Sequence, residues 1–204
     1  MAKKSINRAT IDPTCFNAEA ILPYNLRIDD FRVAMQDVYD FLYDTNDFLV
    51  NKGLSRLDET LRPANMSGFL SDMLTDSVAK HSRSLCRNEY HNGHPDLILK
   101  GVHPKNAAKA AKEGVEIKAT KKKGGAVDTH GGRDQTLCVF VYEIDNQTEP
   151  QINRAPLEFK EVYIFGVKKS DFRKNARGEL GTRTATLHKE GIKKLRQNWV
   201  YKKL

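Results

Sequence analysis

Apolar positions along the chain follow first a helical period and then a strand-like one. Between residues 29 and 50, and again between 65 and 82, apolar side chains recur mostly at spacings of three and four, which predicts two amphipathic helices. Later runs alternate apolar and polar residues or are apolar throughout. They predict strands at 96–99, 114–120, 136–144 and 159–167. Residues 136–144 are apolar on both faces and are therefore expected in the middle of a sheet.

The remaining segments have weaker patterns. Residues 1–25 show no clear period and contain prolines, which predicts an irregular arm before a helical region at about 28–82. Residues 104–113 predict a short basic helix or helical turn. The basic C-terminal segment, 168–204, is expected to contain a turn, an extended piece at 183–186, a helix at 188–197 and an edge strand at 199–201. A chain of 204 residues is long enough for one well-buried domain, so we expect residues 1–204 to fold as a single domain.

Charge is distributed unevenly along the chain. Residues 1–80 contain 9 Lys and Arg against 12 Asp and Glu, a net charge of −3. Residues 81–204 contain 25 against 14, a net charge of +11. A positive field of this kind is typical of proteins that bind the phosphates of nucleic acid. A basic, solvated surface without a ligand is the alternative.

Other features exclude several classes of protein. No apolar run approaches the roughly twenty residues of a membrane span. The N-terminus lacks the apolar stretch of a secretory signal, and no Gly-Lys-Ser/Thr loop indicates a nucleotide cofactor. Cys15, Cys86 and Cys138 are odd in number and form no Cys-x-x-Cys pair, so we expect reduced thiols and a cytoplasmic location.

Two of the expected strands carry polar residues that suit one site. Asp96 opens the run 96–99, and Glu116 and Lys118 lie in the alternating run 114–120. Side chains repeat every two residues along a strand, so Glu116 and Lys118 share one face, roughly 6–7 Å apart. If the two strands are neighbours, the three side chains converge at one point.

A carboxylate pair beside a lysine has the composition of a Mg²⁺ site that cleaves phosphodiesters. Oxygen ligands suit this hard cation, which stabilises charge on the phosphate and lowers the pKa of a bound water. Lys118 would hold the water or the phosphate, and the carbonyl of Ile117 is a further metal-ligand candidate. The alternative is coincidence, because Pro-Asp and Glu-x-Lys are common on solvated surfaces.

Pro95-Asp96, followed after nineteen residues by Glu116-Ile117-Lys118, resembles the motif of the PD-(D/E)xK nuclease superfamily, and within it the small type II restriction endonucleases. The matched nuclease core runs from about residue 66 to 167. The resemblance implies an α/β fold with a central mixed β-sheet of about five strands flanked by helices. It also implies a homodimer that cleaves double-stranded DNA with Mg²⁺, or with Mn²⁺ as a substitute. Asp96 and Glu116 would then bind the metal, and Lys118 would be the catalytic lysine.

The resemblance is incomplete on the helix before the first motif strand. Many members of the superfamily place a glutamate there, whereas the helix expected at 65–82 offers only Asp72 and Asp76. Asp72 is therefore a candidate for an accessory residue of the metal site. Gln135 is a second one, because it begins the strand that follows the motif.

Basic and polar residues after Lys118 are candidates for DNA contacts. The glycine-rich segment 120–135 leaves the catalytic strand directly, and its glycines let the backbone approach phosphates closely. Arginine and glutamine side chains also read base edges. The alternative is a disordered basic loop. The candidates in this segment are Lys121, Lys122, Lys123, His130, Arg133 and Gln135, and those for backbone phosphates in the C-terminal segment are Lys174, Arg177, Arg183 and Lys193.

The sequence therefore predicts a Mg²⁺-dependent, sequence-specific endonuclease. Two other classes remain open: a structure-selective nuclease of DNA repair or recombination, and a non-catalytic DNA-binding protein with a coincidental motif. His91 and His94 raise the alternative of a zinc site, but no second pair of ligands stands at a suitable spacing. A His-metal-finger site would need a ββα arrangement, which the apolar strands after Asp96 do not provide. They are expected to be loop residues or contacts beside the site.

Overall fold

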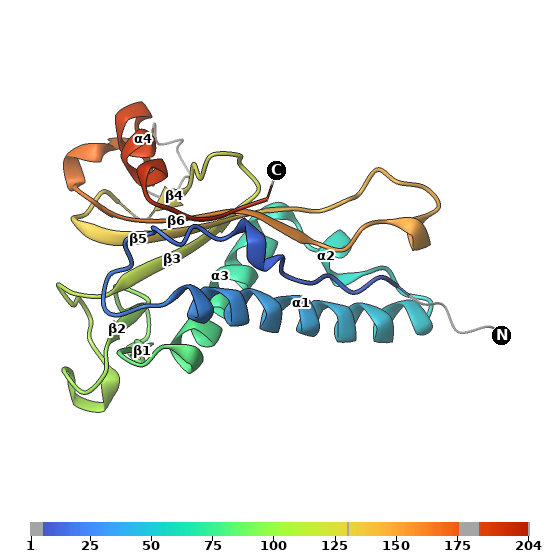
Figure 1. Ribbon diagram of the computed structural model, residues 1–204, viewed down its shortest axis with the longest axis horizontal. Coiled ribbons are helices and arrows are strands. Elements are labelled where there is room, and N and C mark those ends of the chain that lie inside the picture. Colours follow the sequence, from blue (N-terminus) through green and yellow to red (C-terminus); the bar gives the residue numbers. More distant parts are fainter. Residues whose placement is uncertain (1–5, 130, 176–183, 204) are drawn as a thin grey trace, which may run out of the picture.

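A mixed six-stranded sheet forms the centre of the computed structural model, which describes residues 6–129, 131–175 and 184–203 (Figure 1). In spatial order its strands are β1 (Leu85–Arg87), β2 (Leu97–Leu99), β3 (Val115–Thr120), β5 (Gln135–Glu143), β6 (Glu158–Val167) and β9 (Trp199–Lys202). β3 and β5 are parallel, and the other neighbours are antiparallel. The α/β fold with a mixed sheet flanked by helices is confirmed. The sheet has one strand more than expected, because the three residues of β1 are too few to show a period.

Two long helices, α1 (Ile28–Asn51) and α3 (Pro63–His81), cover one face of this sheet (Figure 1). Both lie close to their predicted bounds, and the short α2 (Leu57–Thr60) separates them in sequence. Their apolar stripes meet the sheet in the main core, where Phe31, Met35, Leu70 and Phe140 are buried. Among the described residues, no helix has both the length and the apolar character needed to cross a membrane.

The other face of the sheet packs against α4 (Lys189–Gln197). Leu137, Val139 and Val141 of β5 contact a second apolar cluster that includes Leu195 of α4. The alternate residues of β5, among them Phe140, point into the main core. This double burial confirms β5 as a central strand, and the structure likewise confirms the predicted C-terminal helix and the edge strand β9.

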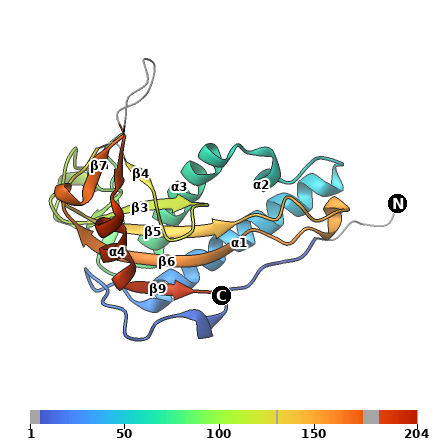
Figure 2. The same ribbon diagram turned by 90° about the horizontal axis from the view of Figure 1, so that it is seen from above.

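A small second sheet lies at the same end of the molecule as α4 (Figure 2). It consists of β4 (Asp128–Thr129), β8 (Ala185–Leu187) and β7 (Phe172–Lys174), in the order β4-β8-β7 and antiparallel throughout. The extended piece expected at 183–186 overlaps β8, whereas β4 and β7 are too short to be found by periodicity. β4 lies on the connection between β3 and β5, so the small sheet is joined directly to the central one.

The basic segment 104–113 is not helical beyond one 3₁₀ turn at Pro104–Asn106. Lys105 has φ = 53° and Asn106 has φ = 52°, left-handed values that end the helical winding. The chain beyond the turn is held by the side chain of Asn88, which accepts from the backbone N–H of Ala108 and donates to its carbonyl. The lysines of this segment therefore do not share one helix face.

The described part of the N-terminal arm, residues 6–25, is irregular, as predicted, and is bonded to the edge strand of the sheet. It forms one 3₁₀ turn at Pro13–Cys15. Phe16 makes an isolated antiparallel bridge to Tyr201 of β9, and the N–H of Asn17 donates to the carbonyl of Val200 at 2.9 Å. The arm thus extends the hydrogen bonding of the edge strand.

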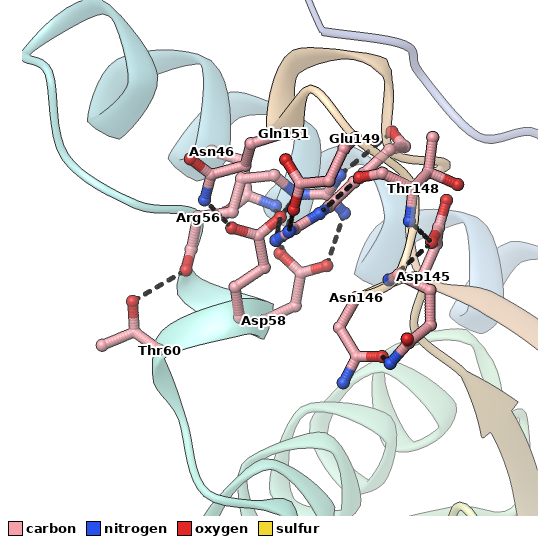
Figure 3. Close-up of polar contacts among 12 residues, drawn as sticks. Asn46, Arg56, Asp58, Thr60, Asp145, Asn146, Thr148, Glu149 and Gln151 are labelled. Carbon is pink, nitrogen blue, oxygen red and sulfur yellow. Dashed lines mark hydrogen bonds and ion pairs between the residues drawn. The ribbon is translucent and has the colours of Figure 1, made fainter.

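Buried charges fix the connection between β5 and β6 to the helical layer (Figure 3). Arg56, just before α2, lies 2.5 Å from Asp58 and donates to the carbonyls of Arg154 and Ala155 on this connection, both at 3.1 Å. Arg154 in turn lies 3.3 Å from Glu59. The side chains of Arg56, Asp58 and Glu59 are 4%, 0% and 6% exposed. Each of these buried charges therefore needs the opposite charge beside it to offset its loss of hydration.

Candidate active site

The pairing of β2 with β3 brings the three motif side chains together. Asp96 immediately precedes β2, and Leu97 pairs with Val115, the residue before Glu116. The backbone N–H of Ile117 donates to Asp96 Oδ2 at 2.8 Å, which fixes this carboxylate beside β3. The two strands are therefore neighbours, as the convergence of the motif requires.

The alternation within β3 separates core residues from site residues. Val115, Ile117 and Ala119 are buried in the main core. The side chains of Glu116 and Lys118 lie on the opposite face, 13% and 22% exposed. The structure thus places both polar side chains on one face, as predicted.

Three oxygen atoms surround the ammonium group of Lys118. Its Nζ lies 2.7 Å from Glu116 Oε1, 3.1 Å from the carbonyl oxygen of Ile117 and 3.6 Å from Asp96 Oδ2. These oxygens belong to Asp96, Glu116 and Ile117, the three metal ligands predicted from the sequence. Their convergence on one cation shows that the site can hold positive charge at this point.

Burial and neighbouring charges shift the pKa values of all three groups. Burial raises the pKa of Asp96 above its usual value, despite the charge of Lys118. Burial opposes ionisation of Glu116 as well, but the hydrogen bond to His94 and the Lys118 charge outweigh it and lower the pKa of Glu116 to about 2. Burial also favours neutral Lys118, yet the Glu116 and Asp96 carboxylates raise the pKa of this lysine. Lys118 is therefore a charged hydrogen-bond donor rather than a base at neutral pH.

His94 belongs to this site, although its role does not follow from sequence spacing. Its Nδ1 lies 2.9 Å from Glu116 Oε2, on the carboxylate oxygen that Lys118 does not contact. Because Glu116 is ionised and can only accept, Nδ1 carries the proton. The backbone of His94 is fixed by hydrogen bonds to Lys109 and Ala111. Proximity to Pro95-Asp96 in the sequence was the only signal for its position.

A cleft of about 540 Å³ opens over the motif residues. Asp72 of α3 and Gln135 of β5 both line it, so the two accessory candidates lie at the site. Arg133, a candidate for DNA contact, also lines it. Gln135 Nε2 is buried and has no hydrogen-bond partner among the described residues. A buried amide of this kind needs a partner, which a ligand in the cleft would provide.

The donor set fits a hard divalent cation. Two carboxylates and a backbone carbonyl converge on one point, and Mg²⁺ typically takes few protein oxygens and keeps several waters. No group of three or more His, Cys, Asp or Glu side chains in the described part of the chain is placed to hold a metal ion. The protein would therefore supply a partial, oxygen-only ligand set: Asp96, Glu116 and the carbonyl of Ile117.

Lys121, Lys122 and Lys123 do not line the cleft. Because β3 and β5 are parallel, the segment between them leaves the far end of β3 and returns to the near end of β5. The lysines lie at the start of this return, where Lys122 pairs with Asp128 at 3.7 Å and Lys123 with Glu143 at 3.3 Å. Only the end of the segment, near Arg133, reaches the site.

The two C-terminal candidates that the structure describes, Lys174 and Lys193, do not line the cleft. Lys174 is exposed on β7, and Lys193 lines a different cleft beside α4. His130, Arg177 and Arg183 lie outside the described residues.

We expect His94→Ala to weaken metal binding, because it leaves one oxygen of Glu116 without its hydrogen-bond donor. Loss of such a supporting contact typically reduces metal affinity about 10- to 100-fold. His94→Asn keeps an N–H donor near the position of Nδ1 and should stay within about threefold of the wild-type protein. Mg²⁺ titration by calorimetry measures this difference. Equal Mg²⁺ affinities of His94→Ala and the wild-type protein would contradict the role of His94.

Comparison with models of known protein families finds no family that matches this chain, and comparison with curated proteins finds no matching relative.

Proposed function

We propose that the protein is a Mg²⁺-dependent endonuclease that hydrolyses phosphodiester bonds of double-stranded DNA, in the manner of a type II restriction enzyme. The observation that carries the proposal is the convergence of Asp96, Glu116 and the Ile117 carbonyl on the ammonium of Lys118. A cation site of oxygen ligands beside a charged lysine suits phosphodiester chemistry, because both neutralise charge on the phosphate.

Asp96, Glu116 and the carbonyl of Ile117 would hold the metal. When bound, Mg²⁺ supplies a Lewis acid that stabilises phosphate charge and lowers the pKa of a coordinated water. His94 keeps Glu116 oriented through its 2.9 Å hydrogen bond. Lys118 stays protonated and donates from Nζ to the attacking water or to a phosphate oxygen.

The surroundings of the site offer room for an extended substrate. The catalytic cleft shares Asn92, His94 and Arg133 with a neighbouring cleft of about 750 Å³. It shares Asp72 and Asn92, among others, with a cleft of about 740 Å³. Further space beside the site suits a substrate longer than a single nucleotide, as a DNA strand is. Arg133 and the unpaired amide of Gln135 provide donors for phosphate or base contacts.

A palindromic recognition sequence would be read by a two-fold homodimer. We therefore propose that the protein acts as a homodimer and that it is located in the cytoplasm. Sedimentation of the protein with and without a cognate duplex tests the dimer.

The test of the proposal is incubation of the purified protein with long, sequenced linear DNA, with and without Mg²⁺. We expect discrete, Mg²⁺-dependent fragments, whose ends identify the recognition sequence and the positions of the cuts. A smear would indicate a nuclease without sequence specificity. Intact linear DNA together with cleavage of junctions or mismatched duplexes would replace the restriction enzyme by a structure-selective nuclease. Intact DNA in all forms would contradict the proposal.

A further inference from the structure

A further cleft lies beside α4 and has a volume of about 690 Å³. It is separate from the cleft over the motif residues, which we call the catalytic cleft. Arg173 of β7 lines this further cleft, as do Lys189, Lys193 and Arg196 of α4. None of these residues lines the catalytic cleft. We call it the basic cleft.

The cations of the basic cleft face one direction. Lys189, Lys193 and Arg196 are spaced at i, i+4 and i+7, which places them along one side of α4. Ile192 also lines the cleft and packs against the second apolar cluster, so α4 is anchored to the sheet below its basic side. The helix therefore holds the backbone positions of these three cations in a row above the sheet.

Arg173, Lys189 and Lys193 have no acidic partner among the described residues. Other cations nearby do. Lys194, the next residue on α4, lies 2.5 Å from Asp171, and Lys122 lies near Asp128. Unpaired like charges in one cleft repel each other, and a polyanion would remove this repulsion.

The overall positive charge of the protein is concentrated in the same segment. Residues 168–204 contain 12 Lys and Arg and 3 Asp and Glu, a net charge of +9, whereas the whole chain carries +8. The other 167 residues are thus at −1. The net positive charge of the protein thus comes from the segment of the sequence that contains β7, β8 and α4.

The basic cleft is held firmly beside the catalytic cleft. Thr129 of β4 lines the catalytic cleft and pairs with Ala185 of β8, which adjoins β7 in the small sheet. The backbone N–H of Lys169 donates to Asp134 at 2.7 Å. A Cβ added to Gly132 would lie 2.9 Å from the Cβ of Phe172, so the chain near Arg133 packs directly on β7. The position of one cleft relative to the other is therefore fixed for a ligand that spans both.

We propose that the basic cleft binds the phosphate backbone of double-stranded DNA outside the catalytic cleft, through Arg173, Lys189, Lys193 and Arg196. The contact is independent of base sequence and of metal. This inference rests on the proposed function in one respect: it assumes that the duplex bound in the basic cleft is the one cleaved in the catalytic cleft. Its role is to hold the duplex while the groove around Arg133 selects the position of the cut.

The test compares Arg173→Gln/Lys193→Gln with Lys52→Gln/Arg62→Gln. Each double variant loses one arginine and one lysine, all four exposed, and the second pair lies outside the basic cleft, at the end of α1 and the start of α3. Fluorescence anisotropy with a labelled 30-bp duplex, in EDTA and at several salt concentrations, measures the dissociation constant. Each phosphate contact contributes about 0.9 to the slope of log K against log salt, so the cleft variant should lose about 1.8 in slope and roughly 60-fold in affinity at 0.1 M salt.

The outcomes separate this inference from the nuclease function. Weaker, less salt-dependent binding by the cleft variant alone supports the basic cleft, whether or not the wild-type protein cleaves DNA. Equal losses in both double variants would show a diffuse charge effect and contradict the inference. Unchanged binding by the cleft variant would also contradict it, even if Mg²⁺-dependent cleavage is observed. Failure of the wild-type protein to bind the duplex in EDTA would overturn it as well.

Discussion

Asp96→Asn is expected to abolish Mg²⁺-dependent DNA cleavage while leaving the fold intact. The substitution removes one of the two carboxylates that would hold the metal, and the expected loss of rate is about 10³-fold or more. The asparagine oxygen can still accept the hydrogen bond from the N–H of Ile117. Burial disfavours the charged form of Asp96, as its raised pKa indicates, so the neutral side chain should not destabilise the metal-free protein.

Lys118→Ala provides the contrasting variant. It should also abolish cleavage, but it leaves Glu116 and Asp96 without the cation that both face. These side chains are only 13% and 29% exposed, so we expect the free energy of unfolding to fall by about 2 kcal/mol. Added Mg²⁺ should recover part of this loss, because it restores a positive charge between the carboxylates.

The measurements are single-turnover cleavage of a cognate duplex and thermal unfolding with and without Mg²⁺. For a chain of this size, 1 kcal/mol corresponds to about 2–4 °C in Tm. We expect the Tm of Asp96→Asn to equal or exceed that of the wild-type protein, and the Tm of Lys118→Ala to be lower. Wild-type cleavage rates in both variants would remove the motif from the mechanism and place the active site elsewhere in the protein.

Arg56→Met is expected to cause the largest loss of stability in this protein. It leaves the buried charge of Asp58 without its guanidinium and Glu59 with only Arg154 as an ion-pair partner, and it leaves the carbonyls of Arg154 and Ala155 without a donor (Figure 3). Removal of one member of a buried ion pair typically reduces the free energy of unfolding by about 3–5 kcal/mol. The Tm should therefore fall by about 6–20 °C.

Arg8→Met is the matched control for this prediction. Arg8 also forms two ion pairs, with Asp40 at 2.8 Å and Asp44 at 3.3 Å, but its side chain is 46% exposed. Surface pairs of this kind contribute about 0–1 kcal/mol. Urea unfolding followed by circular dichroism compares the two variants. A loss below 1 kcal/mol for Arg56→Met would show that the buried cluster does not hold the β5–β6 connection in place.

The sequence by itself determined the features that depend on local periodicity. The apolar stripes of α1 and α3 fixed these helices, and the uniform apolarity of 136–144 identified the central strand. The alternation in β3 placed Glu116 and Lys118 on one face, because side-chain direction along a strand depends only on the neighbouring residues. Short strands, among them β1, β4 and β7, could not be predicted, since two or three residues show no period.

Only the tertiary structure decided which of the polar residues meet. Asp96 reaches Glu116 because Leu97 pairs with Val115, and His94 joins them at the same point. These contacts span twenty or so residues of sequence and depend on strand pairing rather than on spacing along the chain.

Strand direction and packing determined where the basic residues lie relative to the site. Lys121–Lys123 follow Lys118 closely in sequence, yet the parallel pairing of β3 with β5 carries them to the far end of the strand. Conversely, Arg173 and Lys193 lie far from the motif in sequence, and the packing of α4 and β7 gathers them in one cleft. The sequence determined how much positive charge the protein carries, and the chain's path through the sheet determined which of these charges share a cleft.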